Sequence, residues 1–414
     1  MVNYDTVVIG GGPAGMAAAV AAYDEGIKSI AIIELEEELG GILSQCIHSG
    51  FGLHKLGREL TGPEYAEVYR KKVEERNIKT YTNTTVISLS SDKTVTAQNR
   101  DGILKIKAKS VILSMGCRER SAGALGIPGS RPAGVYSAGT AQKLINCEGF
   151  KVGEKAVILG SGDIGLIMAR RLSLEGTKVE AVCEIMPYSG GLNRNIVQCL
   201  EDFKIPLYLS HTVAEIHGKE RLEGVTIAEV DENRNIIEKT KRYIPCDTLL
   251  LSVGLIPENE LTRGAGIPLN RITGGAEVDE SRQTDIPGVF ACGNVLQVHD
   301  LVDYVSDEAQ IAGESAARFV KGENTSEKAV NTAAGAGVRY VLPQKVHPSA
   351  GDISLFMRVL KPCGKVVYTV SSGDKKLAAF SRPKAAPGEM EKLVVKAELL
   401  KDINETITVS LEEQ

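Results

Sequence analysis

Two glycine-rich segments of this chain have the residue types and spacing that bind the pyrophosphate of a dinucleotide. In each, a short apolar run leads into glycines spaced as G-x-G-x-x-G. The first glycine permits a tight turn, the second lets the backbone approach a pyrophosphate, and the third lets the next helix pack closely. These glycines are, in chain order, Gly10, Gly12, Gly15, Gly160, Gly162 and Gly165.

The two segments match beyond these glycines, at a constant offset of 150 positions. The further matches are Gly26 with Gly176, Glu34 with Glu184, and Gly40-Gly41 with Gly190-Gly191. A single G-x-G-x-x-G is weak evidence, because a glycine-rich turn without a ligand also fits it. Two copies that agree at strand, glycines, helix end and acid predict two dinucleotide sites. A chain that holds two dinucleotides most simply passes electrons between them.

Each copy is expected to continue as a helix and a second strand. Pro13 and Ala14 open the first helix, and Asp163 and Ile164 open the second. A helix N-terminus offers free N–H groups and the positive end of the helix dipole to a pyrophosphate. Pro13 suits the first turn, because its missing N–H would have no partner there.

An acid stands near the end of each second strand, 24 positions after the first glycine of its copy. A carboxylate at this place accepts both hydroxyls of an adenosine ribose, which assigns that role to Glu34 and Glu184. No Arg or Lys directly follows Glu184, where the chain reads Ile-Met-Pro-Tyr. A ribose 2′-phosphate would meet an acid without an adjacent cation, so the second copy favours NAD over NADP.

Composition bounds the remaining possibilities. The chain has 414 residues, enough for two or three domains, with 43% hydrophobic and 24% charged residues. A net charge of −5 gives no indication of a basic surface that would bind nucleic acid or a membrane. The apolar stretch 7–23 is broken by glycines and a proline, which favours strand, turn and helix over a membrane span. Eight cysteines without a C-x-x-C pair favour neither a disulfide framework nor a metal site, and a cytoplasmic location is expected by default.

The rest of the chain predicts an α/β protein with an additional β module. Expected elements of the first part are a helix over 63–76, buried strands over 110–116 and 288–294, a helix over 306–320 and a polar linker over 321–326. The part from Val330 alternates in short runs separated by turn residues, at 353–360, 365–370, 376–381, 391–399 and 406–411. This pattern predicts a small antiparallel β-sandwich-like module.

Together these motifs resemble the FAD/NAD(H) oxidoreductases with two dinucleotide-binding domains, a class that includes NADH oxidases, ferredoxin reductases and disulfide reductases. The resemblance covers about residues 1–325. Besides both glycine frames and their acids, it is carried by Asp247, Gly254, Pro257, Thr284 and the run Pro287-Gly-Val-Phe-Ala-Cys-Gly-Asn294. It implies two Rossmann-like domains, the second inserted in the first: 1–120 with 282–326 for FAD, 121–281 for NAD(H), and 330–414 as the C-terminal module.

A narrower resemblance is to the NADH-linked flavoprotein subunits that accompany anaerobic glycerol-3-phosphate dehydrogenases, with opine-oxidase and cyanide-synthase subunits. It is carried by Gly40-Gly-Ile-Leu-Ser-Gln-Cys-Ile-His-Ser-Gly-Phe-Gly52, Gly116-Cys-Arg-Glu-Arg120, Gly160-Ser-Gly-Asp-Ile-Gly165 and Pro387-Gly-Glu-Met390. The resemblance implies FAD at the first copy and NADH at the second. It places further residues at the flavin, namely Gly41, Gly116, Gly293, Asn294 and Ser306, and Gly254 at the NAD copy.

Several positions depart from the family pattern. The usual Asp after Gly293 is Asn294, and the Glu that many relatives carry near the nicotinamide is Ile167, which leaves the nicotinamide clamp unassigned. The paired redox cysteines of disulfide reductases are missing.

The helix that opens near Ser306 is expected to aim its N-terminus at the pyrimidine edge of the flavin and to stabilise the reduced, anionic flavin.

Cys46 follows the Gly40-Gly41 turn and is the catalytic candidate, because a thiolate near a flavin could serve peroxide or sulfur chemistry. A packed structural cysteine is the alternative. His48 and His54 lie in the same loop and could relay a proton, although a structural or surface role explains them as well. Arg118 and Arg120 could meet a phosphate or serve solubility alone. Cys363 by itself cannot hold a cluster.

The expected activity is NADH:acceptor oxidoreduction on FAD, with hydride passing to flavin N5 and electrons passing on to a protein partner or oxygen. The resemblance implies two protein partners, a small redox subunit and a flavoprotein dehydrogenase subunit. One alternative is a peroxide, persulfide or polysulfide reductase that uses Cys46. Another is a flavin-bearing scaffold subunit that works through its C-terminal module, and this module could instead mediate homodimer contacts or cover the flavin domain.

Overall fold

The computed structural model describes residues 1–323, 328–349, 351–401 and 403–414. The chain forms two compact units, Met1–Cys117 with Pro257–Gln414, and Arg118–Ile256, so that the second unit is inserted in the first. The expected division of the chain by cofactor stays a prediction, and residues 324–326 of the expected linker lie outside the described residues. Among the described residues, no helix is both long and apolar enough to cross a membrane.

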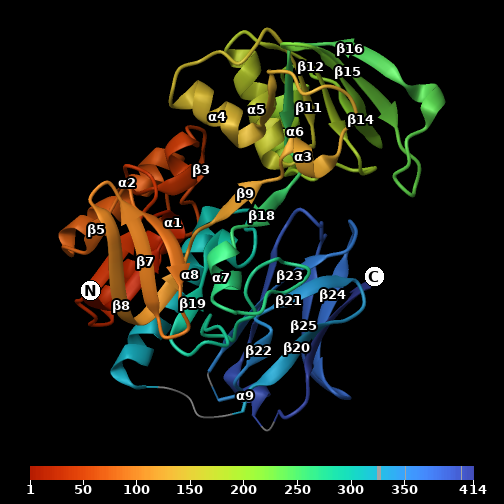
Figure 1. Cartoon of the computed structure of the whole chain (residues 1–414). Helices are drawn as coiled ribbons and strands as arrows, with labels where there is room; N and C mark the ends of the chain where they lie inside the picture. The colour runs from red at the N-terminus through yellow and green to blue at the C-terminus, as the bar shows by residue number, and fades with distance from the viewer. Residues whose placement is uncertain (324–327, 350, 402) are drawn as a thin grey trace. The chain divides into compact units, whose positions relative to one another are not determined.

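The first unit is built on a mostly parallel sheet in the order β5-β2-β1-β8-β7-β6, with β19 beside β8 (Figure 1). Its strands are β1 (Val2–Ile9), β2 (Ile30–Ile33), β5 (Lys79–Tyr81), β6 (Thr85–Leu89), β7 (Thr94–Asn99), β8 (Gly102–Leu113) and β19 (Val289–Ala291). All of β2 and the second half of β1 are buried, as in sheets covered on both faces. This sheet confirms the expected Rossmann-like fold.

Three helices position the carboxyl end of β1, where the first glycine copy lies. They are α1 (Pro13–Asp24), α2 (Gly62–Glu75) and α8 (Val302–Lys321). Gly313 of α8 lets this helix approach α1 closely, because a Cβ there would lie 2.2 Å from the Ala18 carbonyl oxygen. Helix α2 begins with a capping box between Thr61 and Glu64. Helix α8 begins four residues before the expected start at Ser306.

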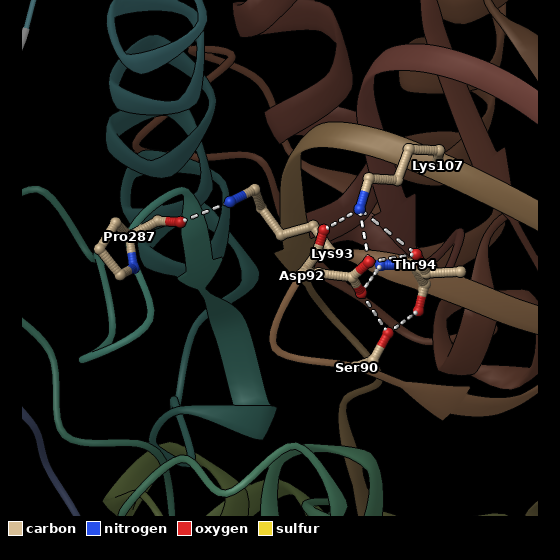
Figure 2. A network of polar contacts seen from close by, with 6 residues as sticks. All are labelled: Ser90, Asp92, Lys93, Thr94, Lys107 and Pro287. Atoms are coloured by element: carbon tan, nitrogen blue, oxygen red, sulfur yellow. Dashed lines mark hydrogen bonds and ion pairs between the residues drawn. The ribbon is translucent and has the colours of Figure 1, made fainter.

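A polar network fixes the hairpin between β6 and β7 (Figure 2). The Asp92 carboxylate accepts hydrogen bonds from the Ser90 hydroxyl at 2.6 Å, from Lys107 Nζ at 2.6 Å and from Thr94. These bonds, led by that from Lys107, lower the pKa of Asp92. Lys93 at the turn donates to the Pro287 carbonyl at 3.0 Å, so the hairpin is tied to the segment that leads into β19.

The second unit repeats the parallel arrangement in the order β10-β17-β11-β12-β13, beside a separate antiparallel sheet β14-β15-β16. The strands of the two sheets are β10 (Val135–Ser137), β11 (Lys155–Leu159), β12 (Lys178–Glu184), β13 (Leu207–Leu209), β14 (His211–Gly218), β15 (Leu222–Glu229), β16 (Arg242–Pro245) and β17 (Thr248–Leu251). Helices α4 (Ala138–Asn146) and α5 (Asp163–Leu174) supply its hydrophobic core. This confirms a second Rossmann-like sheet.

The C-terminal module consists of two sheets in the orders β22-β20-β27-β24-β25 and β21-β23-β26 (Figure 1). Its strands are β20 (Val330–Ala334), β21 (Val338–Leu342), β22 (Lys345–Val346), β23 (Ile353–Val359), β24 (Val366–Ser372), β25 (Lys375–Arg382), β26 (Glu391–Val395) and β27 (Ile407–Glu413). The expected antiparallel strands are confirmed, although β20 and β27 pair in parallel. The run expected as one strand over 391–399 ends at Val395 and is followed by the short helix α9 (Ala397–Leu400).

The module shares a hydrophobic core with the first sheet. Tyr340, Leu342 and Phe356 are buried in one cluster with side chains of β1, β8 and β19. Hydrogen bonds join Gln344 to Val278 in both directions, which adds a polar seam to this contact. Removal of residues 330–414 would therefore expose the core beneath the first sheet, which favours a covering role for the module.

Phe356→Ala should lower the free energy of unfolding by about 3–5 kcal/mol, because it removes a fully buried ring from this shared core. Val394→Ala on the neighbouring strand is the control, since Val394 is 40% exposed and should change stability by about 0.5 kcal/mol or less. Chemical denaturation of both variants provides the measurement. Equal stabilities would mean that the module contributes little to the stability of the first sheet.

Candidate dinucleotide-binding sites

The turn between β1 and α1 has the geometry that its three glycines predict. Gly10 has a φ of +102°, and a Cβ on Gly15 would lie only 1.8 Å from the Gly10 carbonyl oxygen. Only a glycine at position 15 lets α1 begin directly over the strand end. At Gly12 the nearest described atom to a built Cβ is Gly41 Cα, at 4.0 Å. Space is therefore left where a pyrophosphate would approach the backbone.

The N-terminus of α1 is suited to an anion. Gly12 is the N-cap and Pro13 follows it, and within residues 1–323 no side chain caps this end and no acid stands in its first turn. The N–H groups of this turn and the helix dipole therefore favour a negatively charged group. Gly41 and Gly293 border the same place, since a Cβ on Gly41 would lie 3.1 Å from Gly12 Cα and one on Gly293 2.7 Å from Ala14 Cβ.

Glu34 closes this turn from the end of β2. Its carboxylate accepts the Gly11 N–H at 2.6 Å and the Glu36 N–H at 2.8 Å, and its side chain is buried. An ionised carboxylate offers about four acceptor positions, so two or so remain for ribose hydroxyls. The acid thus fixes the turn and faces it, and its contact with a ribose stays a prediction.

The second copy reproduces this geometry in the inserted unit. Gly160 has a φ of +101°, and a Cβ on Gly165 would lie 2.6 Å from the Gly160 carbonyl oxygen. Gly162 is the N-cap of α5, and a Cβ there would come no nearer to a described atom than 3.9 Å. Glu184 accepts the Ser161 N–H at 2.9 Å, the Ser161 hydroxyl at 2.7 Å and the Met186 N–H at 3.0 Å.

The residues that follow the second glycines differ between the copies. Asp163 opens α5, where α1 has proline, and its carboxylate accepts the Leu192 N–H at 2.8 Å and the Asn195 amide at 2.6 Å. Asp163 therefore holds the loop after β12 against the glycine turn. Ile164 and Ile167 pack against the core of this unit. Contact of Asp163 or Ile164 with a dinucleotide stays a prediction, as does the nicotinamide clamp.

Two serines at strand ends were missed in the sequence. Ser114 and Ser252 each close one glycine turn, donating their N–H to the carbonyl of the last residue of β1 or β11. A Cβ on Gly10 would lie 2.5 Å from the Ser114 carbonyl oxygen, and one on Gly160 2.0 Å from that of Ser252. The repeated pattern Leu-Ser-x-Gly, which ends at Gly116 and Gly254, was the available signal. Both of these glycines have positive φ.

The loop after β19 supplies the expected Gly293-Asn294 pair. The Gly293 N–H donates to Glu308 at 3.0 Å, and φ at Gly293 is +74°. The Asn294 side chain accepts the His299 N–H at 3.0 Å and donates to Cys117 Sγ at 3.5 Å. Asn294 thus shapes the loop through its neutral amide, in the position where Asp is usual.

Helix α8 differs from the expectation at its N-terminus. Ser306 lies in the second turn, fully buried, and its hydroxyl is 2.7 Å from that of Tyr65. The buried Asp303 in the first turn accepts three main-chain N–H groups, from Gly52 at 3.1 Å, His54 at 3.1 Å and Lys55 at 2.7 Å. This carboxylate occupies the positive end of the helix dipole and ties the loop 52–55 to α8. A contact between Ser306 and FAD stays a prediction.

The cysteines fall into two groups by burial. Burial raises the pKa of the Cys183 thiol to about 12, that of Cys199 to about 11 and that of Cys246 to about 12, so these thiols stay protonated near neutral pH. Cys46 is half-buried, and its carbonyl accepts the Gly62 N–H at 2.8 Å. A redox role for Cys46 stays a prediction.

The loop histidines have local partners. The His48 ring lies 5.0 Å from that of Phe51, and the His54 ring stacks on Tyr304 at 6.1 Å. Among the described side chains, no group of three or more His, Cys, Asp or Glu residues could hold a metal ion.

The amino-acid sequence matches a known protein family. The family model described as pyridine nucleotide-disulphide oxidoreductase matches residues 4–317. The hydrogen cyanide synthase subunit HcnB of Pseudomonas protegens is 26% identical over 71% of this chain and 66% of its own length. An opine oxidase subunit of Agrobacterium tumefaciens is 27% identical over 64% of this chain and 55% of its own. An NADH oxidase of Methanocaldococcus jannaschii is 26% identical over 74% and 65%.

Solved structures share the fold. Thioredoxin reductase of T. acidophilum has a TM-score of 0.64 at 24% identity, over 78% of this chain and 100% of that one. A NAD-dependent persulfide reductase from A. fulgidus has a TM-score of 0.59 at 20% identity, over 95% of this chain and 71% of that one. The curated relatives named above are longer, and the chain spans 55–66% of their length.

Asp303→Asn should release the loop 52–55, because an amide nitrogen would face the Gly52 N–H and leave a buried donor without an acceptor. We expect a loss of about 1–3 kcal/mol in stability and faster tryptic cleavage at Lys55 or Arg58. Asp307→Asn is the control, since it removes only the exposed ion pair with Lys55 and should cost about 1 kcal/mol or less. Identical cleavage of the two variants would contradict this role of Asp303.

Proposed function

Because the chain belongs to the pyridine nucleotide-disulphide oxidoreductase family, we propose that it is an NADH:acceptor oxidoreductase that uses FAD. Dependence on FAD and on a nicotinamide dinucleotide is common to this enzyme family. The observation that supports the proposal is the duplicated turn. Each copy has an open glycine at a helix N-terminus without a capping side chain among the described residues, and a buried acid that faces the same turn.

We assign FAD to the first copy. There Gly12, Gly41 and Gly293 surround the N-terminus of α1 with main chain that carries no side chains. Glu34 retains acceptor positions for a ribose. The N–H groups of α1 would bind the pyrophosphate, and the loop with Asn294 would lie along the ribityl chain of the flavin. When bound, the two cofactors supply the chemistry, hydride donation by the nicotinamide and its acceptance by the flavin. The protein binds and orients them, and this requires no side-chain acid or base.

We assign NADH to the second copy, with Gly162 at the pyrophosphate and Glu184 at the ribose. The expected contact of Gly254 with this dinucleotide belongs to the same assignment. Three hydrogen-bond donors hold the Glu184 carboxylate in place, and an acid held there would repel a 2′-phosphate. The guanidinium of Arg242 lies 4.6 Å over the ring of Tyr208 in β13, the strand next to β12. This cation is therefore already engaged with an aromatic ring.

The acceptor is proposed from the relatives. Two of them are named as subunits, of hydrogen cyanide synthase and of opine oxidase, and this supports a place in a hetero-oligomeric redox complex. We propose two electron partners, a small redox subunit and a flavoprotein dehydrogenase subunit. In line with the narrower resemblance, the second would be a glycerol-3-phosphate dehydrogenase subunit. A cytoplasmic location is part of the same proposal.

Valine substitutions at the two open glycines should separate the cofactors. Gly12 and Gly162 have φ of −70° and −67°, which any residue adopts, so a side chain there should leave the fold intact and meet only the bound dinucleotide. Gly12→Val should abolish FAD binding. Gly162→Val should keep stoichiometric FAD and lose NADH-dependent bleaching in stopped flow, by about tenfold or more. FAD retained by Gly12→Val would overturn the assignment of the first copy.

The wild-type protein should prefer NADH to NADPH, because Glu184 would repel a 2′-phosphate. The ratio of kcat/KM for flavin reduction should favour NADH by about tenfold or more, which corresponds to about 1.4 kcal/mol. Glu184→Gln should reduce this ratio by removing the charge. A wild-type ratio near one would show that the acid does not face the ribose, and a preference for NADPH would point to Arg242.

A further inference from the structure

The segment 293–301 joins β19 to α8 and contains the Gly293-Asn294 pair assigned to the flavin. Glu308 of α8 holds this segment, because its carboxylate accepts the Gly293 N–H at 3.0 Å and the Gln297 amide at 3.1 Å. The Asn294 side chain accepts the His299 N–H across the same segment. The shape of the segment therefore depends on the position of its second half, around His299.

The C-terminal module holds that second half. Arg358 of β23 donates to the Val298 carbonyl at 3.0 Å and pairs with the Asp300 carboxylate. The other terminal nitrogen of Arg358 donates to the Pro387 carbonyl at 3.0 Å, and the Met390 N–H donates to Asp300 at 2.6 Å. The Pro387–Met390 motif, to which the sequence assigned no role, thus closes around the flavin-proximal segment.

This contact is mostly shielded from solvent, and it is charged. The side chains of Arg358 and Asp300 are 13% and 16% exposed. Burial raises the pKa of Asp300, and the guanidinium opposes that rise. Loss of either partner leaves the other charge buried without its counterion, which displaces the group that remains. A second contact lies alongside it, where the buried Arg282, paired with Glu308, stacks over the ring of Phe356 from the module.

We propose that Arg358 is a positioning residue for FAD, which sets the shape of segment 293–301 through Asp300 and Val298 without contacting the cofactor. The C-terminal module thereby controls how tightly the first copy binds FAD and the midpoint potential of the bound flavin. The proposal rests on the assignment of FAD to the first copy. It gives the module a part in the cofactor site besides its part in the shared core.

Arg358→Met removes the charge and the donors and keeps most of the side-chain volume. The FAD dissociation constant, from fluorescence titration of the apoprotein, should rise by about tenfold or more. The flavin midpoint potential, from dye-equilibrated reduction, should shift as well. Arg382→Met is the matched control in the same module, because Arg382 pairs with Glu391 and its hydrogen bonds to described residues stay within the module. This variant should keep both wild-type values.

Asp300→Asn provides a second, nearly isosteric variant that decides the matter if Arg358→Met does not fold. It should weaken FAD binding in the same direction, and Arg358→Lys should recover part of the affinity. Values for Arg358→Met or Asp300→Asn equal to those of the control would overturn the inference, and so would a lower Tm with unchanged affinity and potential. Failure of the wild-type protein to bind FAD would instead overturn the proposed function.

Discussion

At both candidate sites a helix begins directly over the end of a buried strand, at a turn with no room for a side chain on its third glycine. A Cβ on Gly15 or Gly165 would fall within 2.6 Å of the carbonyl oxygen of the first glycine in its copy. This constraint sets where α1 and α5 point, and it leaves their first-turn N–H groups at the carboxyl edge of a parallel sheet. The other site elements, namely the acid, the strand-end serine and the glycine loops, are placed relative to this turn.

Buried carboxylates that accept main-chain N–H groups hold the loops around these turns. Glu34 and Glu184 fix the turns themselves, Asp303 fixes the loop 52–55, and Glu308 fixes Gly293. An ionised carboxylate out of water requires such donors, since burial without them is costly. The same bonds therefore stabilise the charge and specify the loop shape. This double role explains why each of these acids lies where main-chain N–H groups of a loop or turn converge.

The C-terminal module is joined to the first sheet and its loops by two kinds of contact. Apolar side chains such as Phe356 complete the core beneath β1 and β8, and charged or polar groups, led by Arg358, reach the segment after β19. An apolar surface alone would fix the distance between the parts but permit sliding. The ion pair adds direction, because a guanidinium and a carboxylate pair in a defined geometry.

The sequence alone predicted the duplicated frame, the two Rossmann-like sheets and the acids at Glu34 and Glu184. In each copy the glycines and the acid lie within 24 positions of one another, and the turn requires a φ that only glycine adopts readily. The sequence also predicted the C-terminal strands from their alternation. Only the tertiary structure decided that Asp303 binds the loop 52–55, that Ser306 pairs with Tyr65, and that Arg358 meets Asp300. Those contacts join segments from 58 to 251 residues apart. Their partners are chosen by how helices and sheets pack, and local residue patterns do not encode that choice.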